Sequence, residues 1–390
     1  MKKKIGIIII TIIIIAILIF GALYFIDHKR MEENKPVLFS TWGKDYKVAT
    51  ENKKDNEYQK DEETETSAEI NFALTLEDNV GQDTAWCGTF QLIWNDLKND
   101  LAKQDIIFMQ EPDLQVVKNL NKETFKTEDI SENSYYKVYG NPTLELKEQI
   151  EKAIKEKFNE ESEILDDFSW GSNNPKDYFL YCMLKKEFEF PVAFKELEDG
   201  EFANGKYSKI NYFGLEKDAE EELRNQVEVL YYNSPSQFAV KLKTKQNDEI
   251  ILARGEEGNT FQEIYNNINT NSENYEGIKE FTEKDELKIP NIDFKQKTEF
   301  TELEQKEFSF ANGDVYIIDK ALQTIEFELD KEGGKIKSEA GIMTKEMAIA
   351  TDEIEERKFN FDDEFVIFLK ENDKEKPYFA ASISDITKFQ

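Results

Sequence analysis

Histidine is almost absent from this sequence of 390 residues, in which His28 is the only example. Because His28 lies near the amino terminus, no histidine is available to the rest of the chain. Catalysis by Ser-His-Asp or Cys-His groups is therefore excluded there, and so are metal sites built on imidazole. No GxSxG, Walker A or GxGxxG motif occurs either. We expect a protein that is not an enzyme and that binds no metal ion and no small-molecule cofactor.

Cysteine is also scarce, and the two that are present, Cys87 and Cys182, belong to no CxxC motif. A structural zinc site is thus not indicated. Two interpretations of the pair stay open, a disulfide formed outside the cytoplasm or two buried thiols. We favour the thiols, because unpaired cysteine is among the residue types that are most often buried.

Basic residues are outnumbered, since 50 lysines and arginines stand against 81 aspartates and glutamates, for a formal net charge of -31. Such a charge argues against binding to nucleic acid or to anionic lipid, which are negative themselves. Aromatic side chains are plentiful, with Phe 29 and Tyr 16, and they supply enough apolar material for a folded core. The many carboxylates also leave open an acidic hydrolase that uses a pair of them, although no spacing favours it.

Residues 5–26 form one long apolar run, preceded by three lysines and followed by Asp-His-Lys-Arg. As a helix, these 22 residues span roughly 33 Å, close to the ~30 Å of the hydrocarbon core of a membrane. A cleaved signal peptide would have an apolar region of about 7–15 residues and a small-x-small site, which is missing here. We therefore predict a short tail at residues 1–4 and one transmembrane helix at residues 5–26. The long acidic part favours a single-pass protein of the cell membrane, with its C-terminal domain outside the cytoplasm.

The remaining chain divides into a predicted charged stalk at residues 27–67 and a folded domain at residues 68–390. Most of the stalk has too little apolar surface to order itself. Apolar residues at helical spacing predict helices within 86–101 and 144–158. The run at 178–184 predicts a strand buried on both faces of a sheet. Further strands are predicted at 206–212, 226–232, 238–242, 249–252, 325–329 and 365–369. Early helices and late strands indicate an α+β fold.

Near the carboxyl end, the sequence shows four features in series. They are a strand, an acidic turn with glycines, a long segment and a second apolar strand. The quoted runs are Phe327-Glu328-Leu329-Asp330-Lys331-Glu332-Gly333, then Phe359-Asn360-Phe361-Asp362 and Phe365-Val366-Ile367-Phe368. This series resembles the serpins, in which a comparable strand and hinge open the reactive loop. Residues 71–94 are similar to the first two helices of that family, and residues 150–194 to a helix, a central strand and the corner after it.

The resemblance implies a serpin-like domain with N-terminal helices, large mixed or antiparallel sheets and a reactive-loop-like segment. In the family, a protease cleaves the loop, which inserts as an extra strand into the main sheet and distorts the trapped enzyme. The hinge would consist of Glu332, Gly333, Gly334, Lys335, Ile336, Lys337 and Ser338. The scissile bond would lie near Met347 and Ala348, where Met347 would suit a protease with an apolar pocket. Lys345 or Arg357 would instead indicate a protease specific for basic residues.

The residues after the hinge alternate in a way that suits a strand with one buried face. One set is small or apolar and consists of Gly334, Ile336, Ser338, Ala340, Ile342 and Thr344. The other set is mostly charged and consists of Lys335, Lys337, Glu339, Gly341, Met343 and Lys345. The pattern predicts that the segment is able to insert, although a fixed amphipathic strand or a solvated loop would show the same alternation.

Several positions depart from the family, whose inhibitory members have an alanine-rich hinge. Lysine, as at Lys335 and Lys337, loses more side-chain freedom on ordering than alanine, up to about 1.5–2 kcal/mol. By the resemblance, residues that control the opening of the family's sheet are replaced at Leu180, Gln323, Cys87-Gly88-Thr89 and Glu364. A polar latch is therefore predicted to be largely absent, and Cys87 and Cys182 are predicted to be neighbours in that region.

These departures favour a membrane-anchored, extracytoplasmic, non-inhibitory binding or structural module on a serpin scaffold. The alternative is a suicide-type protease inhibitor that acts by inserting the loop after Gly333. The acidic hydrolase is the third hypothesis. The expected partners are the membrane, through residues 5–26, and for an inhibitor a serine or cysteine protease, while nucleic acid is not expected.

Overall fold

The structure, a computed structural model, describes residues 69–334 and 356–390. The predicted tail, transmembrane helix and stalk, at residues 1–67, lie outside these ranges and stay predictions. The same holds for Lys335, Ile336, Lys337, Ser338, Met347 and Ala348. Within the described part of the chain, no helix is long and apolar enough to cross a membrane.

Seven strands form the largest sheet of the described residues. In spatial order they are β1 (Asn71–Ala73), β2 (Thr84–Cys87), β19 (Pro377–Ile383), β18 (Phe365–Glu371), β10 (Asp248–Arg254), β9 (Gln237–Lys243) and β8 (Val227–Ser234). Neighbours are antiparallel except for β1 and β2, which run parallel. Both faces of β18 and β19 are buried, which explains why these strands are continuous apolar runs in the sequence.

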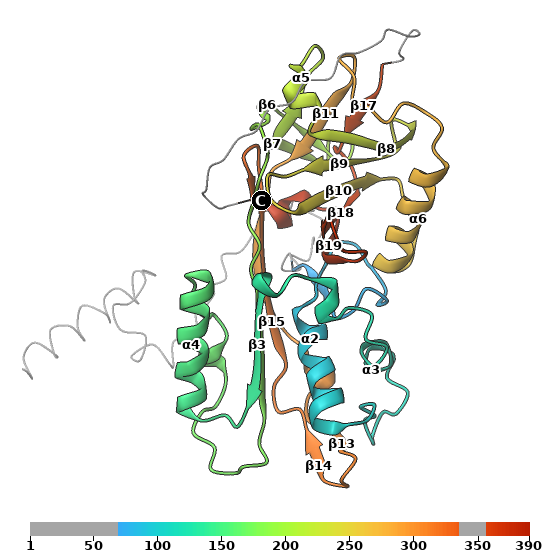
Figure 1. Ribbon diagram of the computed structural model, residues 1–390. Helices are drawn as coiled ribbons and strands as arrows, with labels where there is room; N and C mark the ends of the chain where they lie inside the picture. The colour runs from blue at the N-terminus through green and yellow to red at the C-terminus, as the bar shows by residue number, and fades with distance from the viewer. Residues whose placement is uncertain (1–68, 335–355) are drawn as a thin grey trace, which may run out of the picture. The chain divides into compact units, whose positions relative to one another are not determined.

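A four-stranded sheet shares its core with the larger one (Figure 1). In spatial order it contains β17 (Lys358–Asn360), β11 (Glu286–Pro290), β7 (Tyr207–Leu215) and β6 (Lys195–Phe202). β11 and β17 run parallel, and the other neighbours run antiparallel. Phe238 of the larger sheet makes edge-to-face contacts with Phe359 and Phe361, which join the two sheets around β17.

Two longer antiparallel ribbons matter most for the site. One pairs β3 (Tyr135–Gly140) with β4 (Phe179–Leu184), and the other pairs β12 (Ile292–Glu299) with β15 (Leu322–Leu329). Two short ribbons complete the strands, β13 (Glu307–Ser309) with β14 (Val315–Ile317), and β5 (Phe188–Glu189) with β16 (Gly333–Gly334). β5 follows β4 along the chain, and β16 follows β15.

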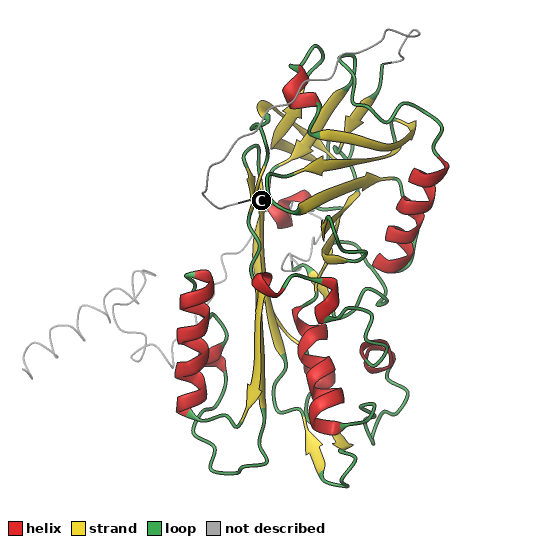
Figure 2. Ribbon diagram, in the orientation of Figure 1, coloured by secondary structure: helices red, strands yellow, loops and turns green. Residues whose placement is uncertain are grey.

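Helices cover parts of these strands (Figure 2). The α-helices are α2 (Thr89–Asp96), α3 (Gln115–Leu120), α4 (Leu144–Phe158), α5 (Glu221–Arg224) and α6 (Phe261–Asn274), and α2 continues as a π-helix at Leu97–Ala102. Short 3-10 helices occur at Thr127–Asp129, Glu132–Ser134, Leu165–Asp167, Thr301–Leu303 and Ile386–Phe389. The predicted helix at 144–158 is α4, which begins where the Thr143 side chain accepts a hydrogen bond from the Leu146 amide. Its apolar side packs on the β3–β4 ribbon.

The predicted α+β fold with mixed sheets is confirmed, but two local predictions are wrong. The resemblance implied two helices over residues 71–94, whereas Asn71–Ala73 and Thr84–Cys87 are strands and only α2 is helical there. Tertiary contacts decide this, because Thr84–Cys87 pairs with β19 and the Trp86 side chain is fully buried. The strand predicted to be buried on both faces is β4, and Leu180 and Cys182 in it are only partly buried because β4 borders a cavity.

Candidate functional site

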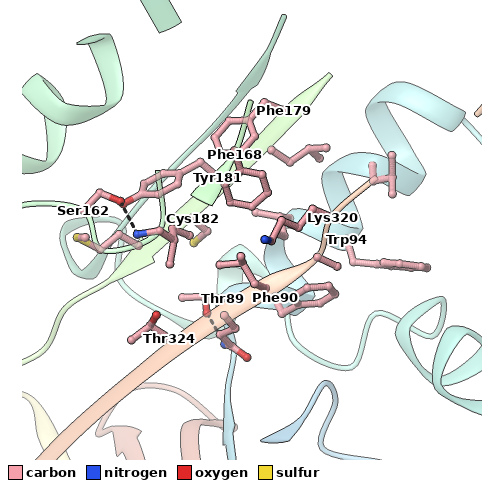
Figure 3. A pocket seen from close by; sticks show the side chains of 18 of the residues that line it. Thr89, Phe90, Trp94, Ser162, Phe168, Phe179, Tyr181, Cys182, Lys320 and Thr324 are labelled. Atoms are coloured by element: carbon pink, nitrogen blue, oxygen red, sulfur yellow. Dashed lines mark hydrogen bonds between the residues drawn. The ribbon is translucent and has the colours of Figure 1, made fainter. Parts of the chain in front are cut away.

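The candidate site is a cavity of about 1320 Å³ that lies between β4 and β15. Residues of both strands line it, together with Phe90, Ile93 and Trp94 of α2, as Figure 3 shows for part of the lining. Among the described residues, β4 has a strand partner only in β3, and β15 only in β12. Each strand therefore presents to the cavity the edge that lacks a strand partner, where backbone groups are able to pair with an added strand.

The two faces of β4 differ in what they contact. Cys182 and Leu184 pack against the core shared by the two large sheets, and we call this side the rear face. Phe179 and Tyr181 are buried against the apolar side of α4, and we call this side the front face. Consecutive strand residues point to opposite faces, so a strand added beside β4 would also have a rear and a front set.

The faces of β15 follow the same division. Gln323, Ile325 and Phe327 are at most 7% exposed, and the two apolar side chains belong to the shared core at the rear. Glu326 points the other way, is exposed, and forms an ion pair with Lys295 at 2.8 Å. The rear face is apolar at both borders, whereas the front face is polar at β15 and apolar at β4.

β16 pairs with β5, whose Phe188 lines the cavity. Gly333 pairs with Glu189 and Gly334 with Phe188, in antiparallel orientation. The turn before β16 returns the chain toward the cavity, and the Gly333 amide donates to the Asp330 carbonyl at 3.3 Å. Gly333 has a φ of +127°, and a Cβ atom added there would lie 2.4 Å from the Phe188 carbonyl oxygen. Only glycine fits this position, so β16 depends on it.

The remaining hinge residue that the structure describes, Glu332, belongs to the same turn. Its amide donates to the Asp330 carboxylate at 2.8 Å, and its carbonyl accepts from the Phe190 amide at 3.0 Å. The Lys331 carbonyl accepts from the Phe194 amide at 2.8 Å. These bonds attach the start of the predicted hinge to the chain just after β5.

A polar contact ties β15 to the start of α2. The Gln323 side-chain amide donates to the Thr89 hydroxyl at 2.6 Å and to the Cys87 carbonyl at 3.2 Å (Figure 3). The prediction of a largely absent polar latch is therefore wrong at this point. Although Gln323 and Thr89 replace the residues of the family, an amide and a hydroxyl are still able to form a hydrogen bond.

Cys87 and Cys182 both line the cavity, and both are free cysteines in the structure. Burial raises the pKa of each thiol. Both residues are thus free thiols that line one cavity, Cys87 from β2 and Cys182 from the rear face of β4. Neutral thiols at this position act as small apolar side chains.

A buried charged cluster fixes the chain between β4 and β5. The Lys186 ammonium lies 2.9 Å from Asp248 and 2.6 Å from Glu371, whose side chains are at most 2% exposed. Burial raises the pKa of Asp248. Burial alone would also raise the pKa of Glu371, but hydrogen bonds from Lys186 and Ser131 hold it below its usual value. The cluster anchors one border of the cavity to β10 and β18.

Arg357 is the one candidate cleavage position that the structure describes. It is 6% exposed, its guanidinium lies 2.7 Å from Asp285, and it donates to the Ile278 and Glu280 carbonyls. The suggestion that Arg357 is presented to a protease is therefore wrong. Instead, this residue fixes the chain just before β17.

The order of elements around the cavity is the predicted one, because β15, the glycine turn of β16, β17 and β18 follow one another along the chain. No model of a protein family matches the chain, and no curated protein matches it. Solved structures do match, and those described next are all serpins. These structures are what the chain is similar to.

Three of these serpins illustrate the likeness. SRPN18 of Anopheles gambiae is 9% identical, with a TM-score of 0.43, over 80% of this chain and 93% of that one. Serpin48 of the insect Tenebrio molitor is 10% identical, with a TM-score of 0.35, over 66% and 78%. Human kallistatin is 13% identical, with a TM-score of 0.38, over 62% and 64%. Since each TM-score is below 0.5, the serpin-like site is interpreted from the residues of this chain alone.

Proposed function

We propose that the chain is a suicide-type protease inhibitor, in which the segment after Gly333 inserts into the cavity between β4 and β15. The observation that carries the proposal is β16, because Gly333 and Gly334 already form the first two positions of a strand that pairs with β5, whose Phe188 lines this cavity. An added strand below them would lie between two edges that have no strand partner among the described residues.

The register of β16 supports the proposal. If the pairing of Gly334 with Phe188 continues, Ser338 falls opposite Leu184 and Ala340 opposite Cys182. If the bridge between Gly333 and Asp330 continues on the other side, the same two residues fall opposite Ile325 and Gln323. Residues opposite each other share a face, so the small and apolar set would point to the rear on both sides.

The charged set would then point to the front. Lys337 would lie opposite Glu326, which is exposed at that face. On the β15 side, the alternation predicted from the sequence therefore agrees with the faces observed in the structure, whereas on the β4 side Lys337 would fall opposite Lys185 and Glu339 opposite Met183. A register shifted by one residue would place lysines in the rear core and would be strongly disfavoured.

A non-inhibitory module on the same scaffold is the second candidate. Lys335 and Lys337 favour it, since ordering each lysine costs up to about 1.5–2 kcal/mol more than ordering alanine. In that case, the segment would not enter the cavity on the time scale of proteolysis.

Incubation with serine proteases that have an apolar specificity pocket distinguishes the two candidates. Because Met347 is the predicted cleavage position, we expect a covalent complex that survives denaturing electrophoresis and has the mass of the protease plus residues 1–347, since residues 348–390 leave as a separate peptide. The matched control is the same protease with its catalytic serine replaced, which should form no such complex. Cleavage near Met347 that leaves an active, released protease would contradict inhibition.

We further propose that this inhibitor is attached to the cell membrane by residues 5–26, with the domain outside the cytoplasm. The support is the length of the apolar run and the charges that flank it. The full chain should remain with membranes at alkaline pH, and protease added to intact cells should degrade the domain. Release of the chain at alkaline pH would contradict the tether.

A further inference from the structure

Exposed large apolar side chains gather at one end of the domain. Nine such side chains occur among the described residues, and seven of them belong to this end, where Figure 1 shows β13, β14, the end of β3 and the start of α4. They are Ile107, Met109, Tyr139, Leu144, Tyr178, Val315 and Ile317. Single exposed apolar residues are common on protein surfaces, whereas a group of them marks a surface for interaction.

Much of this group belongs to a small layer around β13. On one side the Met109 amide donates to the Glu307 carbonyl at 2.7 Å, and on the other side β14 pairs with β13. One face of the layer is part of a buried core, to which Phe108, Phe308 and Tyr316 contribute. Since neighbouring residues of an extended segment point to opposite sides, the other face carries apolar side chains that are 46–57% exposed. They are Ile107, Met109, Val315 and Ile317, and we call these four residues the outer face.

Two tyrosines lie close to this layer. The Tyr178 ring lies 6.2 Å from the ring of Tyr316, and its side chain is 40% exposed. Tyr139 is opposite Leu180, which is two residues after Tyr178. A ring with a polar tip is favoured at a boundary between an apolar phase and water. Apolar residues beside tyrosines are therefore typical of a surface that meets the head groups of a membrane.

The charges near the outer face leave one carboxylate available. Glu307 is exposed, lies opposite Ile317, and forms no ion pair among the described residues, although the Gln110 side-chain amide donates to it at 3.3 Å. Lys306, which precedes it, is paired with Glu111 at 2.8 Å. A quaternary ammonium group complements both a carboxylate and the faces of tyrosine rings. This combination favours a zwitterionic lipid of the phosphatidylcholine type.

The net charge of -31 distinguishes this lipid from two other occupants. It opposes anionic lipid, and it opposes a second copy of the chain through self-repulsion. A neutral lipid surface meets no such repulsion. The predicted stalk also allows the contact, because a flexible chain as long as residues 27–67 spans about 35 Å on average.

We propose that the outer face docks on a zwitterionic lipid surface, with its apolar side chains among the acyl chains and Glu307 beside the ammonium groups. This docking rests on the proposed tether at residues 5–26, which keeps the domain near the membrane and makes even a weak contact effective. A small apolar surface alone gives only reversible membrane binding, so the outer face acts together with the tether.

The test uses the full chain in phosphatidylcholine vesicles, with a fluorophore attached in the variant Met109→Cys whose emission depends on the polarity around it. The unaltered chain, treated in the same way, gives the background from Cys87 and Cys182. We expect emission at a shorter wavelength than from the same label in Ile278→Cys, and quenching by lipids with brominated acyl chains. Anionic lipid added to the vesicles should weaken the quenching, because the chain is acidic.

The variant Val315→Asp with Ile317→Asp should abolish the shift and the quenching at position 109. Its matched control is Val192→Asp with Ile278→Asp, which makes the same kind of change at the two exposed apolar residues outside this end of the domain and should keep both signals. Neither pair should lower the melting temperature much, because all four side chains are exposed.

A label at position 109 that emits as in water, on a chain that alkaline pH does not release, would overturn the docking and leave the tether. A shift without quenching by brominated lipid, which grows with the density of protein, would overturn it in favour of a second copy. Stronger quenching with anionic lipid would overturn the choice of a zwitterionic surface. A quenched label on a chain that alkaline pH releases would support the docking and overturn the tether.

Discussion

Cleavage of the chain between residues 340 and 350 is expected to raise its melting temperature by roughly 10 °C or more. The cut would free the segment 335–344 to pair with both borders of the cavity, adding backbone hydrogen bonds that each contribute about 1 kcal/mol. Two isoleucines, Ile336 and Ile342, would become buried at the rear, and each full burial contributes about 1.5–3 kcal/mol. Since ordering the backbone opposes insertion by about 1–2 kcal/mol per residue, only part of this gain remains as stability.

The measurement is thermal melting followed by circular dichroism or calorimetry, on the cut and uncut protein under the same conditions. A cut placed elsewhere in an exposed loop, for instance in the turn between β6 and β7 near Asn204, serves as the control and should lower the melting temperature or leave it unchanged. An unchanged melting temperature after cleavage between 340 and 350 would mean that the cavity is not filled.

Replacement of Ala340 by arginine should abolish that rise. In the register set by β16, position 340 points to the rear between Cys182 and Gln323, both of which lie among buried groups. A guanidinium in this position would have no carboxylate partner, and an unpaired buried charge costs several kcal/mol. The state with the segment inserted would then no longer have a lower free energy than the state with the cavity open.

The neighbouring variant Glu339→Arg separates this effect from a general effect of a new charge. Position 339 points to the front, opposite Thr324, which is only partly buried, so the rise should be reduced less than by a charge at the rear. Equal losses in the two variants would contradict the assigned register, and the reverse order of losses would indicate a register shifted by one residue.

Much of the fold is readable from local patterns. The spacing of apolar residues predicts a helix within 144–158, and these are the bounds of α4. The strand at 365–369 is also readable, because continuous apolar runs such as β18 arise only where both faces are buried. The glycine pair and the acidic turn before it indicate the hinge, since Gly333 is required by its own φ.

Other features depend on contacts between residues far apart in the sequence. No local sequence pattern shows that Thr84–Cys87 is a strand and not part of the predicted helix. It is a strand because it pairs with β19, which lies near the other end of the sequence. Arg357 is in a charged stretch of the sequence, and only its contact with Asp285 shows that it is buried.

The cavity between β4 and β15 could not be predicted from the sequence. Its borders β4 and β15 read as ordinary strands, and the lack of a strand between them is a property of the sheet order. What the sequence does provide is the alternation after Gly334, which matches the two faces of β15 when the register is continued from β16.

A crystal structure of the protein cleaved between residues 340 and 350 tests this match most directly. The expected electron density is a new strand of residues 335–344, antiparallel to its two neighbours, with Ala340 beside Cys182 and Lys335 beside Glu187. Density that leaves the space between β4 and β15 open, with the cut segment outside it, would show that the cavity serves another purpose.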